Sequence, residues 1–149
     1  MKVETRTPDP VSAAFAWYAS SAHAKDARAF VTIYTDDVHV FDMWNQWELR
    51  GIEAWRAMAE GWFGSLGNER VAVNFSDVVS SVSAELALGH ATVTYTAESA
   101  DGKVLRSLDN RMTVAMRREN GMWKIFHEHT SGPIAHETMK GIIKRNPAG

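Results

Sequence analysis

Hydrophobic and polar residues alternate along the chain with two different periods, and the change falls near Gly67. Before this glycine, apolar residues recur at the spacing of an amphipathic helix. After it, apolar and polar residues alternate singly and β-branched residues become common, which is typical of strands. The pattern therefore predicts a helical first half and a sheet-forming second half.

Three helices are predicted in the first half from apolar stripes and from residues that favour helix starts. The first begins at Asp9-Pro10, because aspartate caps a helix and proline suits its first turn. The second begins at Asp26 and ends at residues 35–37, and the third begins at Gly51. A bulky aromatic face on the third helix indicates that it packs into the interior.

Five strands are expected, and the first of them is short and lies between the second and third helices. They cover residues 38–44, 71–83, 86–99, 104–119 and 122–131. Three helices followed by a curved, largely antiparallel sheet form an α+β fold, with the helices on one sheet face. Such a cone has an opening, so we expect a ligand pocket between the helices and the concave face of the sheet.

The last predicted strand contains the sequence WKIFHEHTS, in which side chains alternate between two faces. Trp123 and Ile125 begin one face, which is the better candidate for the interior. By this alternation His127 and His129 point inward and Glu128 points outward. The two histidines are therefore candidates for contact with a ligand.

The same alternation selects candidate pocket residues on two other strands. In the early strand, Asp42 shares a face with apolar residues and with Trp44, and Asn110 shares a face with Met112 in the strand 104–119. A carboxylate among apolar neighbours is a candidate for acid–base chemistry. The expected ligand-binding residues are Trp44, Trp62, Asn110, Met112, His127 and His129.

The strand 86–99 changes its pattern halfway along. Its apolar set switches from Leu88 to Ala91 and Tyr95, which predicts a β-bulge near Gly89-His90. The pattern does not assign His90 to either face of the sheet.

Composition narrows the classes of function. A chain of 149 residues fits one domain, which we place at residues 1–149 with its core at about 10–135. The chain has no cysteine, which excludes disulfides and thiolate nucleophiles, and its net charge of −2 is scattered, which argues against nucleic acid. The polar N-terminal stretch and the absence of a long apolar run predict a soluble, cytoplasmic protein without membrane contact.

The segment RRENGMWKIFHEHTSGP, residues 117–133, is similar to the closing segment of SnoaL-like domains and of the calcium/calmodulin-dependent kinase II association domain. With the order of elements, it makes the chain resemble the nuclear transport factor 2-like superfamily, which includes ketosteroid isomerases and SnoaL-like polyketide cyclases. The resemblance covers residues 10–133. It implies a cone-shaped, cystatin-like α+β barrel with three N-terminal helices on a curved mixed or antiparallel sheet.

A second resemblance concerns the segment YTDDVHVFD, which ends at Asp42. It resembles the part of ketosteroid isomerases that ends in their general base, and the match extends back to Tyr18, where those enzymes carry an oxyanion-hole tyrosine. The resemblance implies that Asp42 and Tyr18 are catalytic. The position expected for a third, hydrogen-bonding acid falls near Val114, which cannot donate.

Each candidate group also has a purely structural interpretation. Asp42 could be a buried acid whose hydrogen-bond partner is the Tyr18 hydroxyl, because buried polar groups need partners in any case. His127 and His129 could be two metal ligands on one strand face. A metal site needs a third ligand, however, and the similar families ordinarily bind none, so we expect no metal.

Two functions are consistent with the sequence. The first is an isomerase- or lyase-like enzyme without metal or organic cofactor, which abstracts a proton next to the carbonyl of a small apolar ring compound. The second is a non-catalytic ligand-binding or homo-oligomerisation module, like the kinase association domain. In either case Phe126 and its outward neighbours on the sheet predict a homodimer built on the convex face.

Overall fold

The computed structural model describes residues 9–145 of the chain. The helices are α1 (Pro10–His23), α2 (Ala27–Val31) and α3 (Ile52–Ser65). The strands are β1 (Tyr34–Phe41), β2 (Leu49–Arg50), β3 (Arg70–Val82), β4 (Leu86–Glu98), β5 (Val104–Glu119) and β6 (Met122–Ser131). Residues 1–8 and 146–149 lie outside the described residues. Most of the polar N-terminal stretch and both ends of the proposed 1–149 domain therefore fall outside them.

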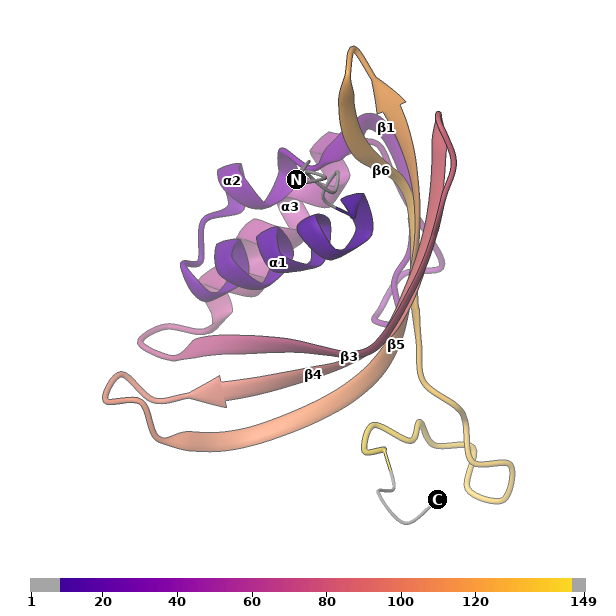
Figure 1. Ribbon diagram of the computed structural model, residues 1–149. Helices are drawn as coiled ribbons and strands as arrows, with labels where there is room; N and C mark the ends of the chain where they lie inside the picture. The colour runs from indigo at the N-terminus through magenta and orange to yellow at the C-terminus, as the bar shows by residue number, and fades with distance from the viewer. Residues whose placement is uncertain (1–8, 146–149) are drawn as a thin grey trace, which may run out of the picture.

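All six strands form one curved sheet in the order β2-β1-β6-β5-β4-β3. β1 runs parallel to β6, and every other neighbouring pair is antiparallel. The three helices lie on the concave side of the sheet, and β3, β4 and β5 curve beneath α1 (Figure 1). The predicted α+β fold with three helices on a curved mixed sheet is confirmed, and the sheet bends without closing into a barrel.

The helices start where the sequence predicts. The Asp9 side chain accepts a hydrogen bond from the Val11 amide at 3.1 Å, and the Asp26 side chain accepts one from the Ala29 amide at 3.0 Å. These bonds satisfy amides at the first turn that have no partner within the helix. α3 follows Gly51, whose φ of +87° suits glycine. Among residues 9–145, no helix has both the length and the apolarity needed to cross a membrane.

β1 begins earlier than the alternation predicts, at Tyr34 instead of Val38, and α2 ends at Val31. Parallel pairing with β6 explains the difference, because Tyr34 lies opposite Ile125 and the Ile125 amide donates to the Ile33 carbonyl at 2.7 Å. Tyr34 is buried in the strand and would also be buried in the predicted helix. Its apolar character therefore does not distinguish the two.

β4 continues through Gly89 without a bulge, contrary to the sequence prediction. Gly89 faces α1, and a Cβ at this position would lie 2.2 Å from a methyl group of Val11. The residue is therefore glycine because the helix approaches the strand closely. Leu88 and His90 point to the exposed face. The irregularity lies instead in β3, after Ser76.

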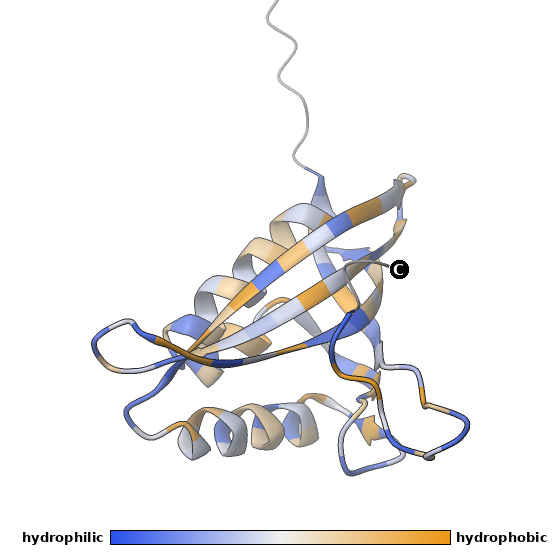
Figure 2. Ribbon diagram, turned by 90° about the horizontal axis from the view of Figure 1, so that it is seen from below, coloured by the Kyte–Doolittle hydropathy of each residue, from blue (hydrophilic) through white to orange (hydrophobic). Residues whose placement is uncertain are grey.

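Aromatic rings from the helices and β1 pack together at the centre of the domain. The ring of Phe30 is fully buried, and five ring centroids lie 4.8–6.2 Å from its own: those of Tyr18, Tyr34, Trp55, Trp62 and Phe63. Burial of this apolar surface stabilises the contact between helices and sheet. Along the strands, hydrophobic and hydrophilic residues alternate (Figure 2), as a sheet with one covered face requires.

Candidate functional site

A β-bulge at Phe126 decides which residues of β6 face the helices. Met116 of β5 lies opposite Ile125, but Ala115 lies opposite His127, so Phe126 has no partner in this ladder. An unpaired residue shifts the alternation of the side chains by one position. The residues that follow the bulge therefore exchange faces.

The bulge reverses the orientation that the sequence predicts for the His-Glu-His segment. Glu128 and Thr130 are buried on the concave side, whereas His129 is exposed and His127 is only partly buried on the convex side. The expectation that both histidines point inward and Glu128 outward is therefore wrong. Strict alternation holds only in an uninterrupted ladder, and nothing in the local sequence marks the interruption.

Glu128 is a fully buried carboxyl group, with only 1% of the residue exposed. Tyr34 donates a hydrogen bond of 2.6 Å to its Oε1 atom, while Oε2 has no hydrogen-bond partner among the described residues. Burial raises the pKa of Glu128 to about 8; the charge of Asp42 raises it as well, and the bond from Tyr34 opposes the shift. The carboxyl group is therefore mostly protonated at neutral pH.

Asp42 follows the end of β1 and is only partly buried. Its Oδ1 atom accepts a hydrogen bond of 2.9 Å from the Thr130 hydroxyl, and the same hydroxyl accepts the Met43 amide at 2.9 Å. Burial raises the pKa of Asp42 above 3.8, although hydrogen bonds from Thr130 and from the amides of Met43 and Trp44 act in the opposite direction. These bonds fix the position of a partly desolvated carboxylate.

Two tyrosine hydroxyls lie together between α1 and β4. The Tyr18 and Tyr95 hydroxyl oxygens are 3.1 Å apart, and either can donate to the other. Burial raises the pKa of both tyrosines, and hydrogen bonding with Tyr18 and, less, with Asn110 partly opposes the shift for Tyr95. Both hydroxyls are therefore neutral donors at physiological pH.

The remaining predicted residues divide between the interior and the surface. Asn110 and Met112 are buried on the concave face of β5. Trp62 of α3 is partly buried, and its ring centroid lies 6.0 Å from that of Tyr95. Trp44 is 46% exposed in the loop after β1. The structure thus brings Asp42 and the interior predicted residues to the concave side and leaves Trp44 largely in solvent.

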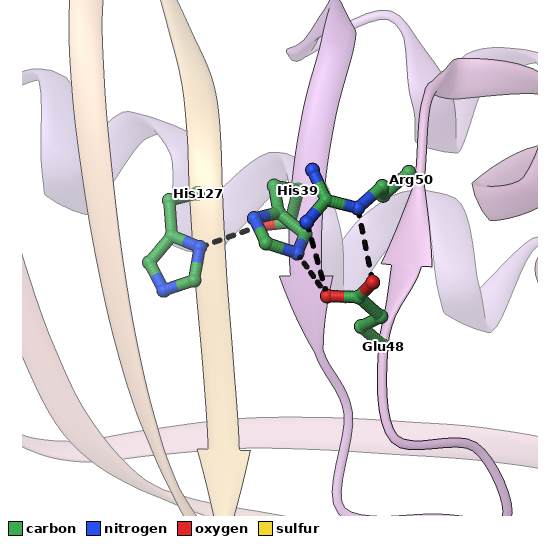
Figure 3. A network of polar contacts seen from close by, with 4 residues as sticks. All are labelled: His39, Glu48, Arg50 and His127. Atoms are coloured by element: carbon green, nitrogen blue, oxygen red, sulfur yellow. Dashed lines mark hydrogen bonds and ion pairs between the residues drawn. The ribbon is translucent and has the colours of Figure 1, made fainter.

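His127 of β6 belongs to a separate polar cluster on the opposite face (Figure 3). His127 Nδ1 donates to the His39 carbonyl at 2.7 Å, His39 contacts Glu48 at 2.9 Å, and Glu48 also pairs with Arg50 at 3.0 Å. His129 packs edge-on against Phe41 in the same area. Among residues 9–145, no three or more His, Cys, Asp or Glu side chains are arranged to hold a metal ion.

Val114 occupies the position where the resemblance places a third acid, and Val114 is fully buried. Glu128 lies directly opposite Val114 in the antiparallel ladder between β5 and β6. Residues in such a pair share one sheet face, with Cβ atoms about 5 Å apart. The interior therefore contains a carboxyl group beside the expected position, supplied by the neighbouring strand.

Three site residues were not found by sequence reasoning: Glu128, Thr130 and Tyr95. Glu128 and Thr130 were missed because the bulge is not visible in the sequence. Tyr95 was assigned to the apolar set of its strand, but its contact with Tyr18 joins residues 77 positions apart. Such a long-range pair requires the tertiary structure.

The family model of the SnoaL-like domain matches residues 11–135 of the chain. The chain therefore belongs to the SnoaL-like domain family. No curated protein matches the chain significantly.

Solved structures with the same fold include an NTF2-like protein of unknown function from Pseudomonas putida, with 23% identity, a TM-score of 0.80 and coverage of 92% of this chain and 94% of that one. A putative calcium/calmodulin-dependent protein kinase II association domain from Xanthomonas campestris has 14% identity, a TM-score of 0.71 and coverage of 87% and 91%. A ketosteroid isomerase-like protein from Erwinia carotovora has 21% identity, a TM-score of 0.63 and coverage of 82% and 92%. At these identities the similarity shows the fold alone.

Proposed function

We propose that the domain transfers a proton next to the carbonyl group of a small, largely apolar ring compound, with isomerisation, cyclisation or dehydration as the outcome. The observation that carries this proposal is a pair of carboxyl groups on the concave side: Glu128 is buried in β6, and Asp42 accepts a hydrogen bond from Thr130, which is buried on the same face of that strand. The charge of Asp42 also raises the pKa of Glu128. When the surroundings of two carboxyl groups give them different pKa values, the group with the lower pKa can act as a base and the other stays protonated as an acid. Asp42 is the hydrogen-bonded, ionised member, and Glu128 is the neutral member.

Asp42 acts as the base in this proposal. Its carboxylate removes a proton from the carbon next to the carbonyl, and the C–H electron pair forms a C=C bond as negative charge develops on the carbonyl oxygen. Asp42 then returns the proton to another carbon. In a dehydration it returns the proton instead to the departing hydroxyl group, which leaves as water when the enolate collapses. Because the proton is taken and returned by the protein, the reaction needs no metal or organic cofactor.

Glu128 supports this chemistry by remaining uncharged. A neutral acid opposite Val114 leaves Asp42 as the single negative charge of the pair, so an enolate forming nearby meets less repulsion than it would beside two carboxylates. The similarity in fold to a ketosteroid isomerase-like protein is consistent with this division of roles.

Deuterium exchange tests the proposal on any ketone that the site accepts, whatever the natural substrate is. In D₂O the protein is expected to exchange the α-protons of at least one member of a panel of monocyclic and fused-ring ketones faster than buffer does, as measured by proton NMR. Asp42→Asn should lower the catalysed rate by about 10²–10⁴-fold, because it removes the base. His129→Ala, on the convex face, is the matched control and should leave the rate unchanged.

A panel in which no ketone exchanges above the buffer rate would contradict the proposal, as would full activity in Asp42→Asn. Tight binding of a ketone without exchange would favour the alternative, a non-catalytic ligand-binding or oligomerisation module. The structural relative that is a putative kinase association domain gives this alternative its support.

We also propose that the domain forms a homodimer through the convex face of the sheet. Leu86 and Leu88 are about half exposed there, with 55% and 50% of each residue accessible. Together with Ala115 and Phe126 they line a hollow of about 410 Å³. Exposed apolar surface of this kind favours contact with a second protein surface.

A further inference from the structure

The two tyrosine hydroxyls of the interior differ in accessibility. Tyr18 on α1 is only 4% exposed, whereas Tyr95 on β4 is only partly buried. Their oxygens are 3.1 Å apart, so the two hydroxyls share one hydrogen bond. When Tyr18 donates to Tyr95, the hydroxyl hydrogen of Tyr95 is free to point at a third group. Of the pair, Tyr95 is thus the better placed to meet a molecule that enters the site.

The charge of the proposed base reaches Tyr95. The Asp42 carboxylate is close enough to raise the pKa of Tyr95 by its charge. Tyr18, by contrast, is influenced chiefly by its burial and by Tyr95, Glu128 and Tyr34. The hydroxyl pair therefore has a buried end at Tyr18 and a more accessible end at Tyr95, and of the two it is Tyr95 whose pKa the charge of Asp42 raises.

An aromatic wall completes this environment. The Trp62 ring centroid lies 6.0 Å from that of Tyr95 and 6.4 Å from that of Tyr18. Trp62 is itself only partly buried, so part of its surface remains accessible. A flat ring compound would gain apolar contact with such a side chain, while its oxygen is directed to a hydroxyl donor.

We infer that Tyr95, and not Tyr18, is the catalytic residue that holds the carbonyl oxygen of the substrate, and that Tyr18 is a positioning residue behind it. This inference rests on the proposed function, and it defines the substrate as a neutral ring ketone or enone that fits between Asp42 and Tyr95. A carboxylate substrate is excluded by repulsion from Asp42. As charge develops on the carbonyl oxygen, Tyr95 donates to that oxygen and Tyr18 donates to Tyr95.

The hydrogen bond from Tyr18 should make the Tyr95 hydroxyl a stronger donor. A hydroxyl that accepts a hydrogen bond becomes a better donor, because the two bonds polarise one another. Tyr18 therefore strengthens the donor without contact with the substrate. Loss of Tyr95 should remove the donor, whereas loss of Tyr18 should only weaken it.

2-Naphthol is a suitable probe, because its oxygen resembles an enolate oxygen and its absorbance reports ionisation. Tyr95→Phe is expected to weaken its binding by tenfold or more, and Tyr18→Phe by about threefold. Tyr18→Phe should also lower the ionised fraction of bound 2-naphthol at fixed pH, which a purely structural role would not do. His129→Ala is the control and should bind like the unmodified protein.

Circular dichroism shows whether each variant folds. If a variant does not fold, an NMR experiment on the unmodified protein tests the inference instead. The chain has three tyrosines, so ¹³Cζ-labelled tyrosine gives three resonances. Bound 2-naphthol should shift the Tyr95 resonance most. The inference is overturned if the Tyr18 resonance shifts most, if Tyr95→Phe binds 2-naphthol normally, or if Tyr18→Phe loses more affinity than Tyr95→Phe.

Asp42→Asn separates this inference from the proposed function. The variant should bind 2-naphthol at least as tightly as the unmodified protein, since it removes a negative charge beside the developing oxyanion. Tyr95-dependent binding together with normal ketone exchange in Asp42→Asn would contradict only the assignment of the base. Binding that is independent of Tyr95, together with Asp42-dependent exchange, would contradict only the assignment of the donor.

Discussion

The Tyr34 hydroxyl donates a hydrogen bond of 2.6 Å to the Glu128 carboxyl group inside the core. Tyr34 begins β1 and Glu128 lies beyond the bulge of β6, so the bond connects the two parallel strands. Both residues are 1% exposed. A carboxyl group in this environment resists ionisation, because a buried charge loses its hydration and gains only one hydrogen bond in return.

The burial of Glu128 should make stability depend on pH. Its pKa rises from 4.5 in the unfolded chain to about 8 in the folded protein, so the folded state binds the extra proton between these values. The free energy of unfolding should therefore fall as pH rises from about 5 to 8, by a few kcal/mol at most, and then level off. Urea unfolding across this range measures the effect.

Glu128→Gln removes the ionisation and should unfold with a flatter pH dependence than the unmodified protein over the same range. Glu60→Gln, at an exposed position on α3, is the control and should retain the original dependence. Identical pH dependences for the unmodified protein and Glu128→Gln would show that Glu128 does not carry a raised pKa.

Thr130 should control the protonation of Asp42. Its hydroxyl bond lowers the pKa of Asp42, so Thr130→Val should raise that pKa further. The acid limb of the ketone-exchange profile should then move to higher pH. The variant should also lose about 1–3 kcal/mol of stability, because the Met43 amide loses its acceptor. If the acid limb stays at the same pH in Thr130→Val, then Thr130 does not control the protonation of the base.

The close approach of α1 to β4 should make Gly89 intolerant of substitution. Gly89→Ala places a methyl group 2.2 Å from Val11, so the helix must shift, at a cost of about 1–3 kcal/mol. Val11→Ala should make the Gly89→Ala substitution less costly in the double variant, which thermal or urea unfolding can measure.

Gly61 offers a matched control in the same protein. It lies within α3, and a Cβ there would have no heavy atom within 4 Å. Gly61→Ala should therefore stabilise the protein by up to about 1 kcal/mol through helix propensity. Equal effects of Gly61→Ala and Gly89→Ala would contradict the close packing of α1 on β4.

The proposed homodimer should depend on the convex face. Leu88→Glu introduces a charge beside the hollow at Phe126 and should convert the dimer to a monomer in sedimentation at micromolar concentration. Lys103→Glu, at an exposed position between β4 and β5, lowers the net charge by two units instead of one, and should leave the dimer intact if negative charge alone does not dissociate it. A monomeric unmodified protein would contradict the proposal directly.

The helices and the longer strands could be predicted from the sequence because their signals are local, whereas the two-residue strand β2, which exists through its pairing with β1, was missed. Asp9-Pro10 at the start of α1 and Asp26 at the start of α2 both act through neighbouring residues. The long strands were also found from alternation alone. Tyr34 was placed in a helix instead of a strand, since its position depends on pairing with a strand far along the chain.

The interior chemistry could not be predicted in the same way. One unpaired residue, Phe126, moves Glu128 inward and His129 outward, and no residue type requires a bulge at that point. Asp42 does lie partly buried near the interior, because the alternation of β1 continues one residue beyond its end at Phe41. Its side-chain partner, Thr130, lies on another strand, and no local pattern in the sequence predicts a contact between residues so far apart in the chain.

The central claim is that the interior holds an ionised base beside a neutral acid. Titration of ¹³C-labelled aspartate and glutamate carboxyl groups by NMR tests this directly, with resonances assigned by their loss in Asp42→Asn and Glu128→Gln. We predict that Glu128 titrates near pH 8 and that Asp42 titrates above 3.8 and before Glu128. A Glu128 resonance that titrates near the ordinary value of 4.5, or an Asp42 resonance at or below 3.8, would contradict the claim.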